Sequence, residues 1–391
     1  MSCALHPLLR NQSNYMWSPQ RYLAEGRKLG RAQNVLAAAV AQIQRVKSHK
    51  PPLPAILSLA HLARRAGVEY GVLWNYAARS ATEPYLRFSI RKRSGGLRRI
   101  SVPEPDLKRV QSWLASQVLK NAPVHSASYA FGQGDSTVKC ASKHCGAKWL
   151  VKIDIADFFG SISEIQVYRV FRSLGYAPLV SFELARICTD RVPQSEKYRL
   201  AAWRSKEKGY VVAPYQQKVL GRLPQGAPSS PALSNLAMRQ LDEEIAAIAK
   251  KHGLTYTRYS DDMTFSTTGE FSRARGTELI AQVAQALKEK GLFLNRRKSA
   301  IIPPGARKVV LGLLVDRQIP ALPREFKEKL RQHLYHLGSK GIDCHVARRE
   351  FDSVGGAYRY LLGTINYANM VDAEFAAEMR TRFEKLPWPG R

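Results

Sequence analysis

The stretch LTYTRYSDDMTFSTT, residues 254–268, predicts a strand, a tight turn and a second strand. Aromatic and β-branched residues dominate both arms, and Ser260, Asp261 and Asp262 interrupt them. Adjacent carboxylates beside apolar strands are unfavourable unless a cation neutralises them. Magnesium suits this role, because it binds carboxylate oxygens together with substrate phosphates. The turn is therefore a candidate metal site.

A further acid ends another apolar segment, KWLVKIDIADFFGSI, residues 148–162. This segment predicts a buried strand that ends at Asp154 and leads into a helix, with Asp157 three residues further on. Either motif alone has a structural explanation, since an Asp before a helix often caps it and an Asp-Asp turn is often solvated. In combination they predict two magnesium ions, about 3.5–4 Å apart, of the kind that promotes in-line phosphoryl transfer.

The charge of the chain indicates a polyanionic partner. It has 61 basic and 31 acidic residues, which gives a formal net charge of +30. Basic residues concentrate in YLRFSIRKRSGGLRRISV, residues 85–102, where Ser94, Gly95 and Gly96 predict a hairpin turn. Such a hairpin can present guanidinium groups to phosphates, and charge on an exposed edge also prevents aggregation. We expect nucleic acid as the partner, ahead of an anionic membrane.

Other patterns exclude several classes of protein. No apolar run reaches the ~18 residues of a spanning helix, and the N-terminal segment has no sustained apolar region. The five cysteines, an odd number, indicate free thiols and a cytoplasmic location. Cys140, His144 and Cys145 lack the second ligand pair of a zinc site, so we do not expect zinc there.

The order of the expected elements predicts an α+β fold. Residues 1–82 are expected to be helical, and residues 106–122 form another helical pattern. The loop LPQGAPSSP, residues 223–231, leads into a long helix, and a later helix ends at Gly291. KVVLGLLVD, residues 308–316, is expected to be one short strand. Strands and helices alternate without a regular βαβ repeat, which favours α+β over a doubly wound sheet.

Taken in order, these motifs resemble those of a reverse transcriptase, and more narrowly of a bacterial retron-type one. The matching segments lie between about residues 85 and 316 and are SGGLRRISVPEPDLKRVQ, VKIDIADFFGSI, LPQGAPSSPALSN, RYSDDMTFS, GLFLNRRKS and VVLGLLVD. The retron resemblance rests on NAPVH, residues 121–125, which matches the pattern N-A-x-x-H. It also rests on PALPREFKEKLRQHLYHL, which resembles the approach to a retron thumb. The sequence departs from the family at Val310-Leu311-Gly312, where retron enzymes typically have Val-Thr-Gly.

The resemblance implies a right-hand polymerase with an antiparallel palm sheet, basic fingers and a helical thumb. We expect an N-terminal helical region over residues 1–82, interleaved fingers and palm over 83–312, and the thumb over 313–391. Asp154, Asp261 and Asp262 correspond to the catalytic, metal-binding carboxylates. The residues that correspond to nucleotide contacts are Arg98, Lys92, Arg93, Phe159, Gln225, Gly226 and Lys298. Those that correspond to RNA contacts are Asn121, His125, Val310 and Gly312.

Three of the nucleotide contacts have separate roles in the resemblance. Phe159 corresponds to a steric gate beneath the sugar 2′ position, whereas we expect Phe158 to be a core residue. Arg98 corresponds to a contact of the fingers with the triphosphate. Lys298 corresponds to the basic residue near the leaving phosphates.

The implied activity is RNA-directed DNA synthesis from deoxynucleoside triphosphates with two magnesium ions. A retron-type enzyme uses a structured non-coding RNA as primer and template, starts from a guanosine 2′-hydroxyl and makes a branched RNA–DNA product, msDNA. The implied setting is antiphage defence with an effector protein and without a membrane.

Three alternatives remain open: a group II intron-like or other reverse transcriptase, an RNA-dependent RNA polymerase, and a non-catalytic RNA-binding scaffold. About 75 residues follow VVLGLLVD, little room for a maturase region and a nuclease domain. Phe159 and the YSDD motif argue against an RNA polymerase. The intact carboxylates argue against a scaffold.

Overall fold

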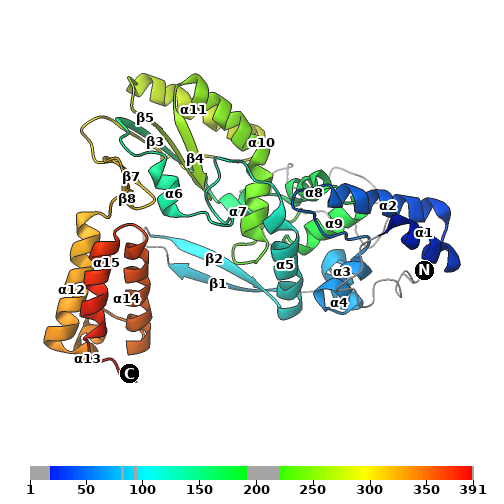
Figure 1. Ribbon diagram of the computed structural model, residues 1–391. Helices are drawn as coiled ribbons and strands as arrows, with labels where there is room; N and C mark the ends of the chain where they lie inside the picture. The colour runs from blue at the N-terminus through cyan, green and yellow to red at the C-terminus, as the bar shows by residue number, and fades with distance from the viewer. Residues whose placement is uncertain (1–17, 81–82, 92–94, 192–219, 390–391) are drawn as a thin grey trace. The chain divides into compact units, whose positions relative to one another are not determined.

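The computed structural model describes residues 18–80, 83–91, 95–191 and 220–389 (Figure 1). Two compact units divide the chain. The first contains Met1–Gln133, Ile155–Glu243 and Leu287–Phe293, and the second contains Gly134–Asp154, Glu244–Ala286 and Leu294–Arg391. No helix within the described ranges combines the length and the apolar character that crossing a membrane requires.

Short helices occupy the described part of residues 1–82, as the sequence predicts; residues 1–17 and 81–82 lie outside the described residues. These helices are α1 (Pro19–Lys28), α2 (Gln33–Lys47), α3 (Leu59–Ala66) and α4 (Tyr70–Ala78). The Ser58 hydroxyl caps α3 by accepting from the His61 backbone N–H, and Gly67 ends that helix in the left-handed conformation. Leu36, Leu62 and Leu73 are wholly buried, so α2, α3 and α4 each bury an apolar side.

A basic hairpin follows in the same unit. Its strands β1 (Tyr85–Arg91) and β2 (Leu97–Pro103) pair antiparallel, and α5 (Pro105–Gln117) and the short 3-10 helix η2 (Leu119–Asn121) come next. Gly95 and Gly96 both have positive φ, as the turn requires. The hairpin is therefore confirmed.

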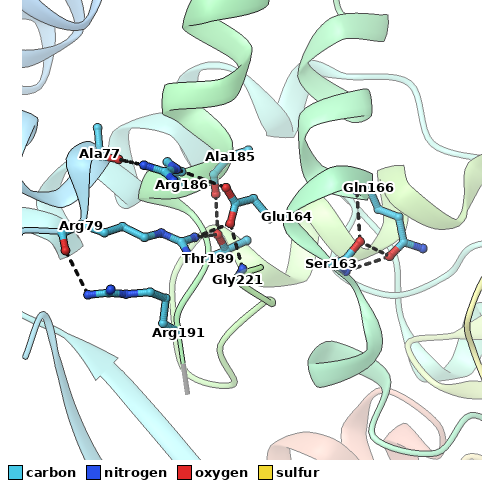
Figure 2. Close-up of polar contacts among 10 residues, drawn as sticks. All are labelled: Ala77, Arg79, Ser163, Glu164, Gln166, Ala185, Arg186, Thr189, Arg191 and Gly221. Atoms are coloured by element: carbon cyan, nitrogen blue, oxygen red, sulfur yellow. Dashed lines mark hydrogen bonds and ion pairs between the residues drawn. The ribbon is translucent and has the colours of Figure 1, made fainter. Parts of the chain in front are cut away.

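Three further helices of this unit are α7 (Phe158–Ser161), α8 (Glu164–Ser173) and α9 (Pro178–Ile187). A buried polar network connects α8 and α9 to Arg79, which follows α4. Arg79 Nη2 donates to Glu164 Oε2 at 2.6 Å, and Arg186 Nε donates to Glu164 Oε1 at 3.3 Å. The backbone N–H of Gly221 also donates to Glu164 Oε2 at 2.8 Å. Figure 2 shows Glu164 at the centre of these contacts. The residue is buried, with 5% of its surface exposed.

Gly221 is needed at its place in this network. A Cβ atom there would lie 2.2 Å from Arg79 Nη2 and 2.5 Å from Thr189 Oγ1. Thr189 accepts a further hydrogen bond from Arg79 Nη2 at 2.8 Å. The network is therefore packed too closely for any larger residue at position 221.

An antiparallel sheet forms the centre of the second unit. Its strands run in the order β4-β5-β3-β6, with β3 (Trp149–Asp154), β4 (Thr255–Tyr259), β5 (Asp262–Thr267) and β6 (Ala300–Ile302). The helix α6 (Thr137–Ser142) and most of α11 (Arg273–Glu289), up to Ala286, belong to the same unit. The α11 backbone approaches β6 at Gly276, where a Cβ would lie 2.9 Å from Ile301 Cδ1. The long helix α10 (Ser230–Lys251) contains the division between the units, at Glu243.

Helices also end the second unit. They are α12 (Arg324–Lys340), α13 (Ile342–Arg348), α14 (Val354–Asn369) and α15 (Ala373–Glu384). Their buried side chains form one apolar cluster that also contains Leu150 of β3 and Val310. This cluster connects the end of the chain to the sheet within the unit.

The structure confirms the α+β class, with helices beside an antiparallel sheet, and it corrects one predicted element. Residues 308–316 do not form one strand but a small hairpin of β7 (Val309–Val310) and β8 (Leu313–Leu314). Leu311 and Gly312 form its turn with φ of 49° and 85°. An apolar run does not reveal a left-handed Leu, and this is why the pattern resembled a continuous strand. The boundaries at residues 82 and 312 stay a prediction.

Candidate active site

The second unit gathers the three predicted carboxylates at one end of its sheet. Asp154, the last residue of β3, pairs directly with Asp262, the first residue of β5. Directly paired residues of antiparallel strands project from the same face of the sheet, so both carboxylates share one face. Asp261 precedes Asp262 in the turn after β4. The strand–turn–strand prediction for residues 254–268 is thereby confirmed.

Burial and mutual repulsion make this carboxylate group electrostatically unusual. Burial, followed by the neighbouring Asp154 charge, raises the pKa of Asp261 above its ordinary value. Burial and the adjacent Asp261 charge raise the pKa of Asp262 in the same way. Such raised values mean that the folded chain holds negative charge where it is unfavourable.

Two lysines partly offset that charge. Lys298 Nζ donates to Asp154 Oδ2 at 2.7 Å, and this hydrogen bond is the main reason why the pKa of Lys298 is raised. Lys152 lies two residues before Asp154 on β3, hence on the same face, and its charge lowers the pKa of Asp262. Three carboxylates thus face two ammonium groups.

The donor chemistry of the carboxylate group fits a divalent ion of the magnesium type, which takes carboxylate oxygens. Within the described residues no group of three or more His, Cys, Asp or Glu side chains is arranged to hold a metal ion. That is consistent with magnesium, which takes one or two protein carboxylates and completes its shell with water and substrate phosphates. One or two of Asp154, Asp261 and Asp262 would supply the carboxylate oxygens for such an ion.

The first unit brings together two segments that the resemblance assigned to the nucleotide. The backbone N–H of Ser101 on β2 donates to the Gln225 carbonyl oxygen at 2.8 Å. The next residue, Gly226, has φ of +121°, and a Cβ there would lie 3.0 Å from Ile100 Cγ2 and from the Ser101 carbonyl oxygen. Only glycine allows this approach. The strand that carries Arg98 is therefore bound to the loop that carries Gln225.

The two aromatic residues after Asp154 differ in burial. Phe158 is buried at 4% exposure, whereas Phe159 is half-buried and lies 6.4 Å, centroid to centroid, from Phe131. Asp157 is the N-cap residue of α7 with φ of 47°, and its carboxylate lies 3.9 Å from Arg222 Nη1. Phe158 thus packs as a core residue, and Phe159 keeps an accessible surface, as a gate would need.

The predicted basic contacts are only partly described. Arg98 is exposed on β2, opposite Ile90. Lys92 and Arg93 lie outside the described residues.

The residues that correspond to RNA contacts are scattered over both units. His125 Nδ1 accepts from the Ala127 backbone N–H at 3.1 Å, and Nε2 lies 3.3 Å from Glu243 Oε2. Asn121 Nδ2 donates to the Gln117 carbonyl oxygen at 3.4 Å. Val310 is wholly buried, whereas Gly312 lies exposed in the β7–β8 turn. An RNA role for these residues stays a prediction.

The sequence interpretation missed three residues around the carboxylates. Lys152 could have been found, because the alternation of a strand puts it on the face of Asp154. Arg258 stands out as a charged residue in a buried strand. The sequence pattern raises His144 only as a candidate zinc ligand and does not indicate its contacts with the sheet: Nδ1 lies 2.7 Å from Ser266 Oγ and Nε2 lies 2.7 Å from Thr257 Oγ1. It links the strands β4 and β5 that flank the turn.

Comparisons with known proteins agree with the motifs. A family model described as reverse transcriptase (RNA-dependent DNA polymerase) matches residues 90–313. The Retron Mx65 reverse transcriptase of Myxococcus xanthus is 30% identical over 84% of this chain and 72% of its own length. The Retron Ec86 reverse transcriptase of Escherichia coli is 30% identical over 74% of this chain and 79% of its own length.

Other matches are shorter or looser. The Retron Mx162 reverse transcriptase of Myxococcus xanthus is 33% identical over 64% of this chain, and the chain spans about half, 52%, of that relative's length. Among solved structures, telomerase from Candida albicans gives a TM-score of 0.38 at 11% identity, covering 77% of this chain and 63% of that chain.

Proposed function

The chain belongs to the reverse transcriptase family and, within it, to the retron reverse transcriptases, and we propose that it copies a structured RNA into DNA. The observation that carries this proposal is the pairing of Asp154 with Asp262 across β3 and β5, with Asp261 beside them. Three crowded acids, of which Asp261 and Asp262 have raised pKa values, are unfavourable in a scaffold, but they suit a polymerase that binds cations and triphosphates.

The chain's own residues would do the following in synthesis. Two magnesium ions, when bound, lower the pKa of the attacking hydroxyl and stabilise the leaving pyrophosphate. Asp154, Asp261 and Asp262 would hold these ions. Lys298, with a raised pKa, would keep a proton close to the leaving phosphates. In-line phosphoryl transfer needs positioning and charge neutralisation more than a protein nucleophile.

Residues of the first unit would bind the rest of the nucleotide. Arg98 would contact the triphosphate, since a guanidinium forms paired hydrogen bonds with phosphate oxygens. Gln225 and Gly226 would line the base and sugar, because their loop is fixed against β2. Phe159 would exclude the 2′-hydroxyl of a ribonucleotide.

The finer retron activity is part of the same proposal. The template and primer would be a structured non-coding RNA, and the product an RNA–DNA hybrid that becomes branched msDNA. The enzyme would act in the cytoplasm, in antiphage defence, together with an effector protein. The names of the relatives and the net charge of +30 support the RNA partner.

A direct assay separates the enzyme from a scaffold. Wild type should incorporate labelled dTTP on poly(rA)/oligo(dT) with magnesium, whereas Asp154→Asn should not. A wild-type protein that binds this duplex but incorporates nothing would favour the scaffold.

A second assay separates the retron hypothesis from the hypothesis of a group II intron-like enzyme. Coexpression with the non-coding RNA encoded beside the gene should give DNA joined covalently to RNA, and RNase treatment should shorten that product. If DNA forms only from an added primer and never carries RNA, the group II intron-like alternative is favoured.

A further inference from the structure

Arg258 is a wholly buried cation on the side of the sheet away from the carboxylates. It lies on β4 and pairs with Met263 of β5, which in turn pairs with Ile153 of β3. Asp154 and Asp262 are the next paired positions, so their side chains project from the opposite face. Arg258 is 0% exposed. A guanidinium is unfavourable there unless polar atoms satisfy it.

One of those polar atoms belongs to the catalytic turn. Arg258 Nη1 donates to the carbonyl oxygen of Ser260 at 3.0 Å. Ser260 has φ of 59°, a left-handed conformation that a residue with a Cβ atom rarely adopts. Its hydroxyl in turn donates a hydrogen bond to the Asp261 carboxylate. The turn that carries both acids is therefore held from beneath the sheet.

We propose that Arg258 is a positioning residue, which fixes the left-handed Ser260 backbone and thereby aims Asp261 and Asp262. The inference rests on the proposed function, because it assumes that these acids bind metal ions. Arg258 acts through the peptide between Ser260 and Asp261, because its side chain and those of Asp154 and Asp262 project from opposite faces of the sheet.

Arginine has the shape for this task and lysine does not. The planar fork of arginine directs several N–H groups at fixed angles, whereas an ammonium is a compact charge on a flexible stem. Arg258→Lys keeps the buried charge but should leave the Ser260 carbonyl poorly held. Glycine adopts positive φ without a Cβ penalty, so Ser260→Gly should make the turn less dependent on Arg258. Ser260→Ala removes the same hydroxyl but keeps Cβ, and it is the matched control.

The experiment measures two properties of each variant. Steady-state dTTP incorporation on poly(rA)/oligo(dT) gives kcat and KM, and electron paramagnetic resonance of free Mn²⁺ gives metal affinity without catalysis. Arg258→Lys should lower kcat by about 10²-fold, the effect of a misplacement of about 1 Å. It should weaken Mn²⁺ binding and leave KM for dTTP unchanged. Adding Ser260→Gly should restore kcat by at least about tenfold, and adding Ser260→Ala should not.

Several results would overturn the proposal. If Arg258 were merely structural, Arg258→Lys would lower the melting temperature, but the folded variant would keep wild-type kcat and Mn²⁺ affinity. Equal effects of the glycine and alanine changes would show that Arg258 does not act through the Ser260 backbone. Failure of both Arg258→Lys and the shape-matched Arg258→Met to fold would also assign the residue to stability alone. If wild type neither binds Mn²⁺ nor incorporates dTTP, the proposed function itself fails.

Discussion

Two clusters of charged side chains in this protein, one buried and one partly buried, differ in charge balance. In the first unit, one carboxylate, Glu164, receives hydrogen bonds from Arg79, Arg186 and the Gly221 backbone N–H (Figure 2). In the second unit, three carboxylates share two lysines. The pKa of Asp261 is raised by burial and by the Asp154 charge, and that of Asp262 by burial and by the Asp261 charge. The first cluster balances its charge within the chain, whereas the second has more acidic than basic groups.

This difference separates a structural cluster from a functional one. A satisfied buried ion pair contributes little to activity, but removal of one partner leaves an unpaired buried charge. An unsatisfied cluster lowers stability and provides binding capacity for an ion or substrate. Substitutions in the two clusters should therefore have opposite effects on stability and activity.

The largest effect should come from Asp261→Asn. It removes a metal ligand, so DNA synthesis should fall by at least about 10³-fold, equivalent to the several kcal/mol that metal ions supply. The free energy of unfolding should stay the same or rise, since one repelling charge is removed. Primer extension and urea unfolding measure the two quantities. Synthesis within about tenfold of wild type would remove Asp261 from the site.

Glu164→Ala should show the reverse pattern. It leaves Arg79 and Arg186 buried without their shared partner, which should lower the free energy of unfolding by about 3–5 kcal/mol. Activity per folded molecule should be retained. Glu325→Ala is a matched control, because Glu325 pairs with both Nη atoms of Arg307 at 2.6 and 2.9 Å but on the surface. If both substitutions change stability equally, burial does not distinguish the two pairs.

His144, which contacts β4 and β5, allows a test of how the stability of the sheet depends on pH. Burial lowers its pKa from an ordinary 6.5 to about 4, so the folded protein holds it neutral. As pH falls, His144 takes up a proton in the unfolded chain before it does so in the folded protein. Its contribution to the free energy of unfolding is therefore present above pH 6.5 and is lost progressively towards pH 4. The loss should be roughly 3 kcal/mol.

The variant His144→Gln isolates this titration. At pH 7 it should be less stable than wild type, because Ser266 and Thr257 lose their imidazole partner. The difference in the free energy of unfolding between the two proteins should narrow as pH falls to 4.5. Only wild type carries this buried imidazole, which binds a proton more readily in the unfolded chain, so wild type loses stability on acidification. Urea unfolding over this pH range measures it, and a constant difference would show that His144 does not titrate as described.

The sequence predicted the second cluster better than the first, for a physical reason. The turn at Ser260 to Asp262 and the strand that ends at Asp154 are local patterns, in which alternation and turn residues are visible. The Glu164 cluster unites residues 79, 164, 186 and 221, whose proximity depends on how three helices pack. No local pattern encodes that. Leu311 shows the same limit at short range, since its left-handed backbone has no signal in an apolar run.

Phe159→Ala should affect selectivity more than either stability or overall activity. Loss of the ring should admit ribonucleotides and reduce discrimination between dCTP and CTP by about 10²-fold. Phe158→Ala, its buried neighbour, should instead lower the free energy of unfolding by about 3–5 kcal/mol. Single-nucleotide incorporation measures discrimination for both variants. An unchanged ratio in Phe159→Ala would exclude it as the gate.

The most direct test of the central claim is the stability of the protein with and without a divalent ion. Thermal unfolding of wild type in EDTA is compared with unfolding at a Mn²⁺ concentration about 100 times the dissociation constant. Binding to the folded state alone should add about 2.7 kcal/mol. Asp154→Asn and Asp261→Asn should lose this gain, whereas Glu164→Ala should keep it despite its lower starting stability. An equal gain in Asp261→Asn, or no gain in wild type, would contradict the assignment of these carboxylates as a metal site.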